Sequence, residues 1–201
     1  MENRCDPDRP VAGGRMLARM EGRVVFVAGA IPGEQVVVRV TRATKHALWA
    51  DVVEVVTPSP DRRQPPGDPA CGGLAYAHVR YERQLQLKSE VIADAFRRLA
   101  GITLGAPPPV AGSPERGYRL RARLHVRNGR AGFFREGTHQ LCDAGTTGQL
   151  LPETLPAVER LLASLGSRTA ECDAIVVAEN VAATERVLHL EPREGARLDD
   201  L

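Results

Sequence analysis

The chain has 201 residues and a formal net charge of +2, from 27 basic and 25 acidic side chains. With 43% hydrophobic residues it can bury a core, which excludes an intrinsically disordered chain. No apolar run reaches the roughly 18 residues that a membrane-spanning helix needs. The N-terminal segment also lacks the hydrophobic stretch of a secretory signal. We therefore expect a cytoplasmic protein with no membrane partner.

The first 57 residues predict a small, OB-like β-barrel. Apolar runs at 15–19, 23–30, 32–43 and 46–56 are separated by turn signals such as Glu21-Gly22. Closing such short strands into a barrel removes exposed sheet edges. The segment before residue 11 is poor strand material, which predicts an incomplete barrel.

The remainder of the chain mixes helices and strands. Residues 57–69 contain five prolines and predict a linker or loop. Apolar residues at helical spacing predict a helix over 79–100 and a second one over 152–166. Asn128-Gly129 predicts a hairpin turn, and 173–180 with 185–191 a final hairpin. We expect an α+β protein in three parts: a barrel over 1–57, a proline-rich linker and cysteine loop over 58–78, and a mixed α/β domain over 79–201.

Three long motifs resemble the RNA uracil-5 methyltransferases. The first, over 11–41, reads VAGGRMLARMEGRVVFVAGAIPGEQVVVRVT and resembles the TRAM domain that opens this family. The next is SPDRRQPP followed by ACGGLAYAHVRYERQLQLKSEVI, where a cysteine-bearing loop leads into a helix. The third, over 117–143, is GYRLRARLHVRNGRAGFFREGTHQLCD, which resembles the central domain. The resemblance covers roughly residues 11–190 in order.

This family's cysteine loop usually holds a 4Fe–4S cluster. The loop reads Cys, five residues, then Cys-Gly-Gly-Cys, with a fourth cysteine far downstream. Position by position, the second ligand falls on Cys71 and the downstream one on Cys142, whereas the first and third fall on Pro65 and Leu74. Neither proline nor leucine can ligate iron, and four thiolates are the norm for such clusters. We predict that no cluster or other metal is bound, with Cys71 and Cys142 as remnants and Leu74 filling the space.

Other cysteine chemistry is left open by the sequence. Four cysteines in a chain of this length without a secretory signal argue against a disulfide scaffold. Cys5 or Cys172 could replace the lost ligands, as could His78 or His139. This possibility defines a rival reading, an iron–sulfur or redox protein.

The resemblance implies S-adenosylmethionine as methyl donor and 5-methyluridine in rRNA or tRNA as product. That chemistry needs a glycine-rich cofactor loop, a cysteine nucleophile and a general base. Gly13-Gly14 belongs to the predicted barrel, 144–150 has the wrong spacing, and Cys172 lacks the family's active-site context. We therefore expect no catalytic residue and no bound cofactor in this chain, and expect the catalytic domain to be missing after its C-terminus.

RNA binding is then the function to seek. On the barrel, the candidates are basic residues with one aromatic: Arg15, Arg19, Lys45, His46 and Trp49. In the central domain, alternation places Arg119, Arg121 and Arg123 on one strand face, which His125 continues, and such a face can follow phosphates. Trp49 could instead pack in the core, and the arginine face could simply be solvated.

These observations favour the RNA-recognition portion of an rRNA or tRNA uracil-5 methyltransferase, which would bind an RNA stem-loop. A free-standing RNA-binding TRAM protein without catalysis is the alternative. We expect either protein to bind RNA with a steep dependence on salt.

Overall fold

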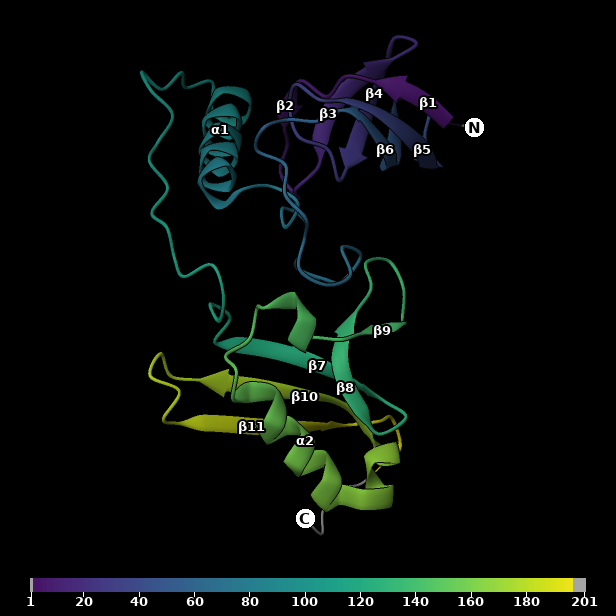
Figure 1. The fold of residues 1–201 in the computed structure, drawn as a ribbon, viewed down its shortest axis with the longest axis vertical. Helices are drawn as coiled ribbons and strands as arrows, with labels where there is room; N and C mark the ends of the chain where they lie inside the picture. The colour runs from purple at the N-terminus through teal and green to yellow at the C-terminus, as the bar shows by residue number, and fades with distance from the viewer. Residues whose placement is uncertain (1, 197–201) are drawn as a thin grey trace. The chain divides into compact units, whose positions relative to one another are not determined.

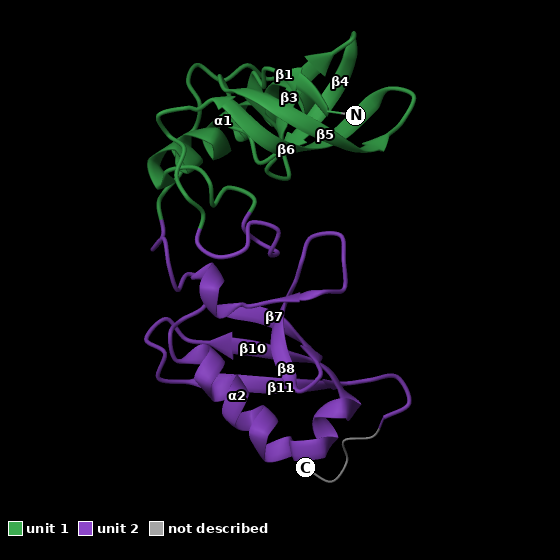
Figure 2. Cartoon of the chain, turned by 45° about the vertical axis from the view of Figure 1, so that its right-hand side comes forward, with its two compact units in different colours: residues 1–65, 75–112 green, residues 66–74, 113–201 purple. Residues whose placement is uncertain are grey.

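The computed structural model describes residues 2–196, and these form two compact units (Figure 2). The first unit takes the residues up to 65 together with 75–112, and the second takes 66–74 together with the chain from 113 onward. The helix expected in the central domain therefore belongs with the N-terminal unit, and the cysteine loop belongs with the C-terminal one. No helix among the described residues is both long and apolar enough to cross a membrane.

The first unit is a six-stranded sheet followed by one helix (Figure 1). The strand order is β1-β5-β6-β4-β3-β2, antiparallel throughout except where β4 pairs with β6. Its elements are β1 (Glu2–Cys5), β2 (Arg9–Pro10), β3 (Met16–Met20), β4 (Arg23–Ala28), β5 (Gln35–Ala43), β6 (Ala47–Thr57) and α1 (Tyr81–Leu99). The predicted Glu21-Gly22 turn joins β3 to β4, with positive φ at both residues.

Two expectations for the barrel need correction. The N-terminal segment does form a strand, because its backbone pairs with β5 from Glu2 opposite Arg39 to Cys5 opposite Val36. Pairing with an existing edge overrides weak local propensity. The described strands also leave β1 and β2 as the two ends of the sheet order, so the hydrogen-bonded closure of a barrel is not shown.

One face of this sheet carries the core of the first unit. The core consists mainly of small and β-branched side chains, among them Ala18, Val25, Val27 and Val38. Leu87 of α1 is fully buried with them. The apolar stripe along the second half of α1 becomes more exposed toward its end, from 39% at Ile92 and 43% at Phe96 to 85% at Leu99.

A buried ion pair fixes the proline-rich segment to the sheet. The Glu34 side chain is fully buried and accepts hydrogen bonds from the backbone N–H groups of Ile31 (2.9 Å) and Ser59 (3.0 Å). It also accepts two from the Arg62 guanidinium, both at 2.6 Å. Burial by itself raises the pKa of Glu34, but these hydrogen bonds and the Arg62 charge outweigh it and lower that pKa. The segment is therefore a fixed part of the unit.

The second unit is a five-stranded antiparallel sheet in the order β11-β10-β7-β8-β9. Its elements are β7 (Arg121–Arg127), β8 (Arg130–Phe134), β9 (Leu141–Cys142), η1 (Gly145–Thr147), α2 (Thr154–Leu165), η2 (Gly166–Glu171), β10 (Cys172–Glu179) and β11 (Arg186–Pro192). Asn128 and Gly129 both have positive φ, as the predicted two-residue hairpin requires. The helix α2 lies against one face of the sheet (Figure 1) and buries Val158, Leu162 and Leu165.

Candidate nucleic-acid interface

The outer face of the first unit's sheet combines an aromatic pair with basic side chains. Strand register places Leu17, Phe26, Trp49 and Arg42 in one row across β3, β4, β6 and β5. These positions alternate with Met16, Val25, Val27, Leu48 and Ala50, which belong to the core on the opposite face. Trp49 therefore does not pack in the core, the alternative that the sequence had left open.

Trp49 is held between an aromatic ring and a cation. The Phe26 ring lies 5.5 Å from the indole, centroid to centroid, with the two planes tilted by 38°. The guanidinium carbon of Arg42 lies 4.8 Å from the indole centroid, in the geometry of a cation–π contact. The sequence alone had singled out neither Phe26 nor Arg42. Arg42 reaches this face only through a register shift between Val40 and Arg42, which no local pattern indicates.

The four basic candidates of this unit are distributed around that row. Arg19 is exposed on the same face, in the register position next to Val24. Lys45 and His46 are exposed in the turn between β5 and β6. Arg15 is partly occupied, because its guanidinium donates to Asp51 at 3.4 Å and to the Ala50 carbonyl at 3.5 Å.

In the second unit, β7 turns Arg121, Arg123 and His125 away from α2. Ala122, Leu124 and Val126 between them are buried on the opposite face. Arg119 does not join this row, because it precedes the strand. Its guanidinium donates to the Gln149 side chain at 2.8 Å and lies 4.9 Å from the Phe133 ring. The expected row of three arginines is therefore a row of two.

Two carboxylates partly neutralise this arginine face. Arg123 donates to Glu191 at 2.7 Å and to Asp173 at 3.1 Å. Arg127, which the sequence did not single out, donates to Asp173 at 2.9 Å. These hydrogen bonds, first that from Arg127, outweigh partial burial and lower the pKa of Asp173. Among the described residues, Arg121 makes no side-chain ion pair or hydrogen bond, so its charge is available.

His125 is part of an aromatic cluster on the same face. Its ring stacks on Phe134 with centroids 3.6 Å apart and planes 5° from parallel, and His139 meets Phe134 edge-on at 5.3 Å. Burial, and then the charge of Arg123, lower the pKa of His125, so its ring is neutral at pH 7. His125 therefore contributes an aromatic surface here and no charge.

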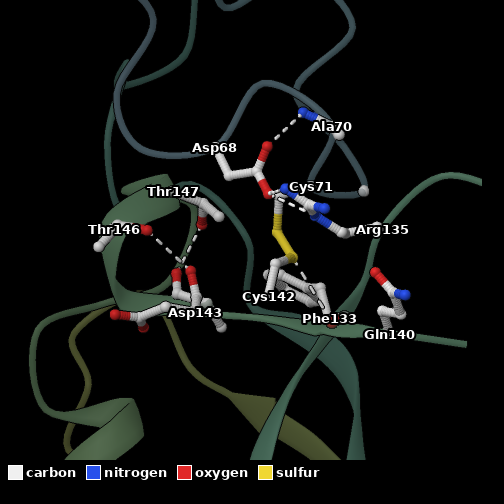
Figure 3. Close-up of a disulfide and its surroundings, with 12 residues drawn as sticks. Asp68, Ala70, Cys71, Phe133, Arg135, Gln140, Cys142, Asp143, Thr146 and Thr147 are labelled. Atoms are coloured by element: carbon white, nitrogen blue, oxygen red, sulfur yellow. Dashed lines mark hydrogen bonds and ion pairs between the residues drawn. A yellow bond between two sulfur atoms is a disulfide. The ribbon is translucent and has the colours of Figure 1, made fainter.

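The cysteine loop is docked on the second unit by backbone and side-chain bonds (Figure 3). Cys71 and Cys142 form a disulfide with their Cα atoms 5.8 Å apart, which the argument against a disulfide scaffold had not anticipated. Asp68 forms an ion pair with Arg135 at 2.6 Å. Gly72 donates to the Phe134 carbonyl at 3.1 Å. Cys71 and Cys142, the two positions that correspond to cluster ligands in the family, therefore lie side by side.

The described residues do not fit an iron–sulfur cluster. Leu74 is buried, and neither it nor Pro65 has a donor atom for iron. Burial and then Asp6 raise the pKa of Cys5 to about 11, and burial raises the pKa of Cys172. Both are buried free thiols, and the Cys172 Sγ–H donates to the Ala174 carbonyl at 3.2 Å. Within residues 2–196, no three His, Cys, Asp or Glu side chains are grouped as a metal site needs.

Comparison with known proteins identifies the domain and the relatives. Residues 9–53 match the TRAM domain. The chain is 36% identical to an uncharacterized RNA methyltransferase of Streptomyces coelicolor, over 94% of this chain and 44% of the relative. It is 35% identical to the 23S rRNA (uracil(1939)-C(5))-methyltransferase RlmD of Methylococcus capsulatus, over 87% of this chain and 42% of that protein.

The chain belongs to the RNA uracil-5 methyltransferase family. Its fold is also that of a solved structure, the tRNA (uracil-54, C5)-methyltransferase of Pyrococcus abyssi in complex with S-adenosyl-L-homocysteine. That match has a TM-score of 0.65 and 22% identity, and it covers 97% of this chain and 47% of the other. The present family member therefore spans less than half the length of the relatives it matches.

Proposed function

We propose that this chain is the RNA-recognition portion of a cytoplasmic RNA uracil-5 methyltransferase acting on rRNA or tRNA. The observation that supports this most directly is the outer face of the TRAM unit, where an aromatic pair lies among exposed cations. Single-stranded nucleic acids are bound by such surfaces, since cations neutralise phosphates and aromatic rings stack on bases. The TRAM match and the methyltransferase relatives support RNA as the polymer.

S-adenosylmethionine would supply the methyl group in the complete enzyme. Within residues 2–196, the candidate glycine segment 144–150 forms only the short η1 and a turn, not a strand–loop–helix unit that cradles a nucleotide. We therefore assign no methyl-transfer step to these residues. Their task is to bind and orient RNA, so that a target uridine can be extruded toward a catalytic domain.

The test is the salt dependence of RNA binding by the full chain. Exposed cations that meet no carboxylate among the described residues include Arg19, Arg42, Lys45 and Arg121. If each contacts one phosphate, the logarithm of the binding constant falls with the logarithm of salt concentration with a slope of about −3. A fluorescently labelled stem-loop RNA, titrated at several salt concentrations, measures this slope. Absence of binding even at low salt would refute the proposal.

A methylation assay separates recognition from catalysis. We expect no transfer of radiolabelled methyl groups from S-adenosylmethionine to RNA by this chain alone. The size of the natural polypeptide then separates the enzyme portion from the free-standing RNA-binding protein. A polypeptide clearly larger than 21.8 kDa in the source cells supports the former.

A further inference from the structure

The indole of Trp49 is presented on the sheet surface as a half-buried ring. Phe26 supports it at 5.5 Å, and its place opposite the core is fixed by pairing with β4 and β5. A rigid, supported aromatic ring on an open β-sheet is what a nucleic-acid base stacks on. Arg42 is the cation that the described residues place over this ring.

Arg42 covers the indole without being held there by a carboxylate. Within the described part of the chain its guanidinium makes no ion pair or hydrogen bond, and it lies over the Trp49 ring. The nearest acid in this register is Asp51, two residues along β6 on the same face, and Arg15 already binds it. A cation–π contact at an exposed site is weaker than base–aromatic stacking. A base can therefore displace the guanidinium.

We propose that Trp49 is a stacking site for one unpaired RNA base, and that Arg42 moves from the indole to the phosphate of the same nucleotide. This inference rests on the proposed function and adds to it the class of substrate, a single-stranded segment. A duplex cannot use the site, because its bases are already stacked and their faces are covered. Arg19 and Lys45 lie in the same sheet and its adjoining turn, where they can follow the neighbouring phosphates.

The chain contains a single tryptophan, so its fluorescence reports on this site alone. We would titrate the full chain with a single-stranded ten-nucleotide RNA, with a duplex of the same length, and with inorganic polyphosphate. Labelled-RNA anisotropy would measure binding in parallel. The expected result is quenching of tryptophan emission by the single strand, saturating together with anisotropy, and no quenching by polyphosphate.

Substitutions separate stacking from charge. Trp49→Leu should weaken single-strand binding by about 5- to 100-fold and leave the salt slope unchanged. Trp49→Phe, which keeps an aromatic ring, should restore most of the affinity. Arg42→Gln should reduce the salt slope by about one. Lys88→Gln is the matched control, because it removes an exposed charge of the same unit from α1. Circular dichroism of each variant checks that it is folded.

The outcomes distinguish this site from RNA binding in general. If RNA binds but tryptophan emission does not change, and folded Trp49→Leu binds as tightly as the parent, the stacking site is refuted and the proposed function stands. Equal quenching by duplex and single strand would also overturn it. If no RNA binds at low salt, the proposed function fails and this inference fails with it.

Discussion

Replacing Glu34 by glutamine removes one charge from a fully buried side chain and changes little in its shape. The carboxylate receives four hydrogen bonds, two on each oxygen, from Ile31, Ser59 and the Arg62 guanidinium. Glutamine keeps only one oxygen, and its amide group then faces two donors. Both donors on that side, one backbone N–H and one guanidinium N–H, are left without an acceptor, and the Arg62 charge is left without its counterion.

The expected cost follows from these contacts. Breaking a buried ion pair by removing one partner costs about 3–5 kcal/mol. The remaining Arg62 bond to the Gly29 carbonyl (2.8 Å) and the 22% exposure of its side chain place the cost at the lower end. We expect a loss of about 3 kcal/mol, or roughly 12–24 °C in the melting temperature of a unit of this size.

Urea unfolding monitored by Trp49 emission measures this loss, since the only tryptophan lies in the same unit. Because folding lowers the pKa of Glu34, its carboxylate stabilises the folded state fully above pH 4.5, the ordinary pKa. This stabilisation is lost as the pH falls through the lowered pKa of the folded state. The variant should lack this acid-dependent part. Glu54→Gln, an exposed exchange on β6, is the control and should stay within about 0.5 kcal/mol of the parent. A loss below about 1 kcal/mol for Glu34→Gln would refute the reasoning.

Two further predictions concern His78 and the disulfide. His78 is buried with Nε2 3.0 Å from the Ala30 carbonyl, and burial first of all lowers its pKa. Below pH 6.5 the unfolded chain therefore gains a proton at His78 that the folded chain does not, so stability should fall as pH drops through that value. The urea midpoints at pH 7.5 and pH 5.5 should differ less in the His78→Gln variant than in the parent. An unchanged difference would contradict this prediction. The Cys71–Cys142 bond joins residues 71 apart in sequence, which by chain entropy corresponds to about 4 kcal/mol. Unfolding of the second unit, followed by circular dichroism, should shift by up to that amount on reduction, whereas the double variant Cys71→Ala/Cys142→Ala should not respond to reductant.

Local signals predicted much of this fold. Asn128, Gly129 and Gly22 readily adopt the positive φ that the two turns need, and both turns occur as expected. Helix periodicity predicted α1 and α2 within two residues at each end. These features depend on residues that are close in the sequence, so local sequence patterns are enough to predict them.

Features set by distant residues were not predictable in the same way. The strand at the N-terminus exists because β5 offers an edge, with Cys5 opposite Val36 and Glu2 opposite Arg39, far outside any local sequence window. The face that Trp49 occupies was ambiguous, since Ala47, Leu48 and Ala50 around it are all apolar. The neutralisation of Arg123 depends on Asp173 and Glu191, which are 50 and 68 residues further along the chain. No short motif carries that information.

Segment 66–74 belongs to the second unit although the chain on both sides of it belongs to the first. This affects how the protein folds during synthesis and where it can be cut into fragments. The chain passes between the units after residues 65, 74 and 112, so neither unit is a continuous piece of the gene product. During translation the first unit can complete its sheet and helix before Cys142, the disulfide partner of Cys71, has been synthesised. A cut at residue 112 would separate the second unit from the segment that docks against β8. Such a fragment does not contain the segment and could recover it only by reassociating with the piece that ends at residue 112.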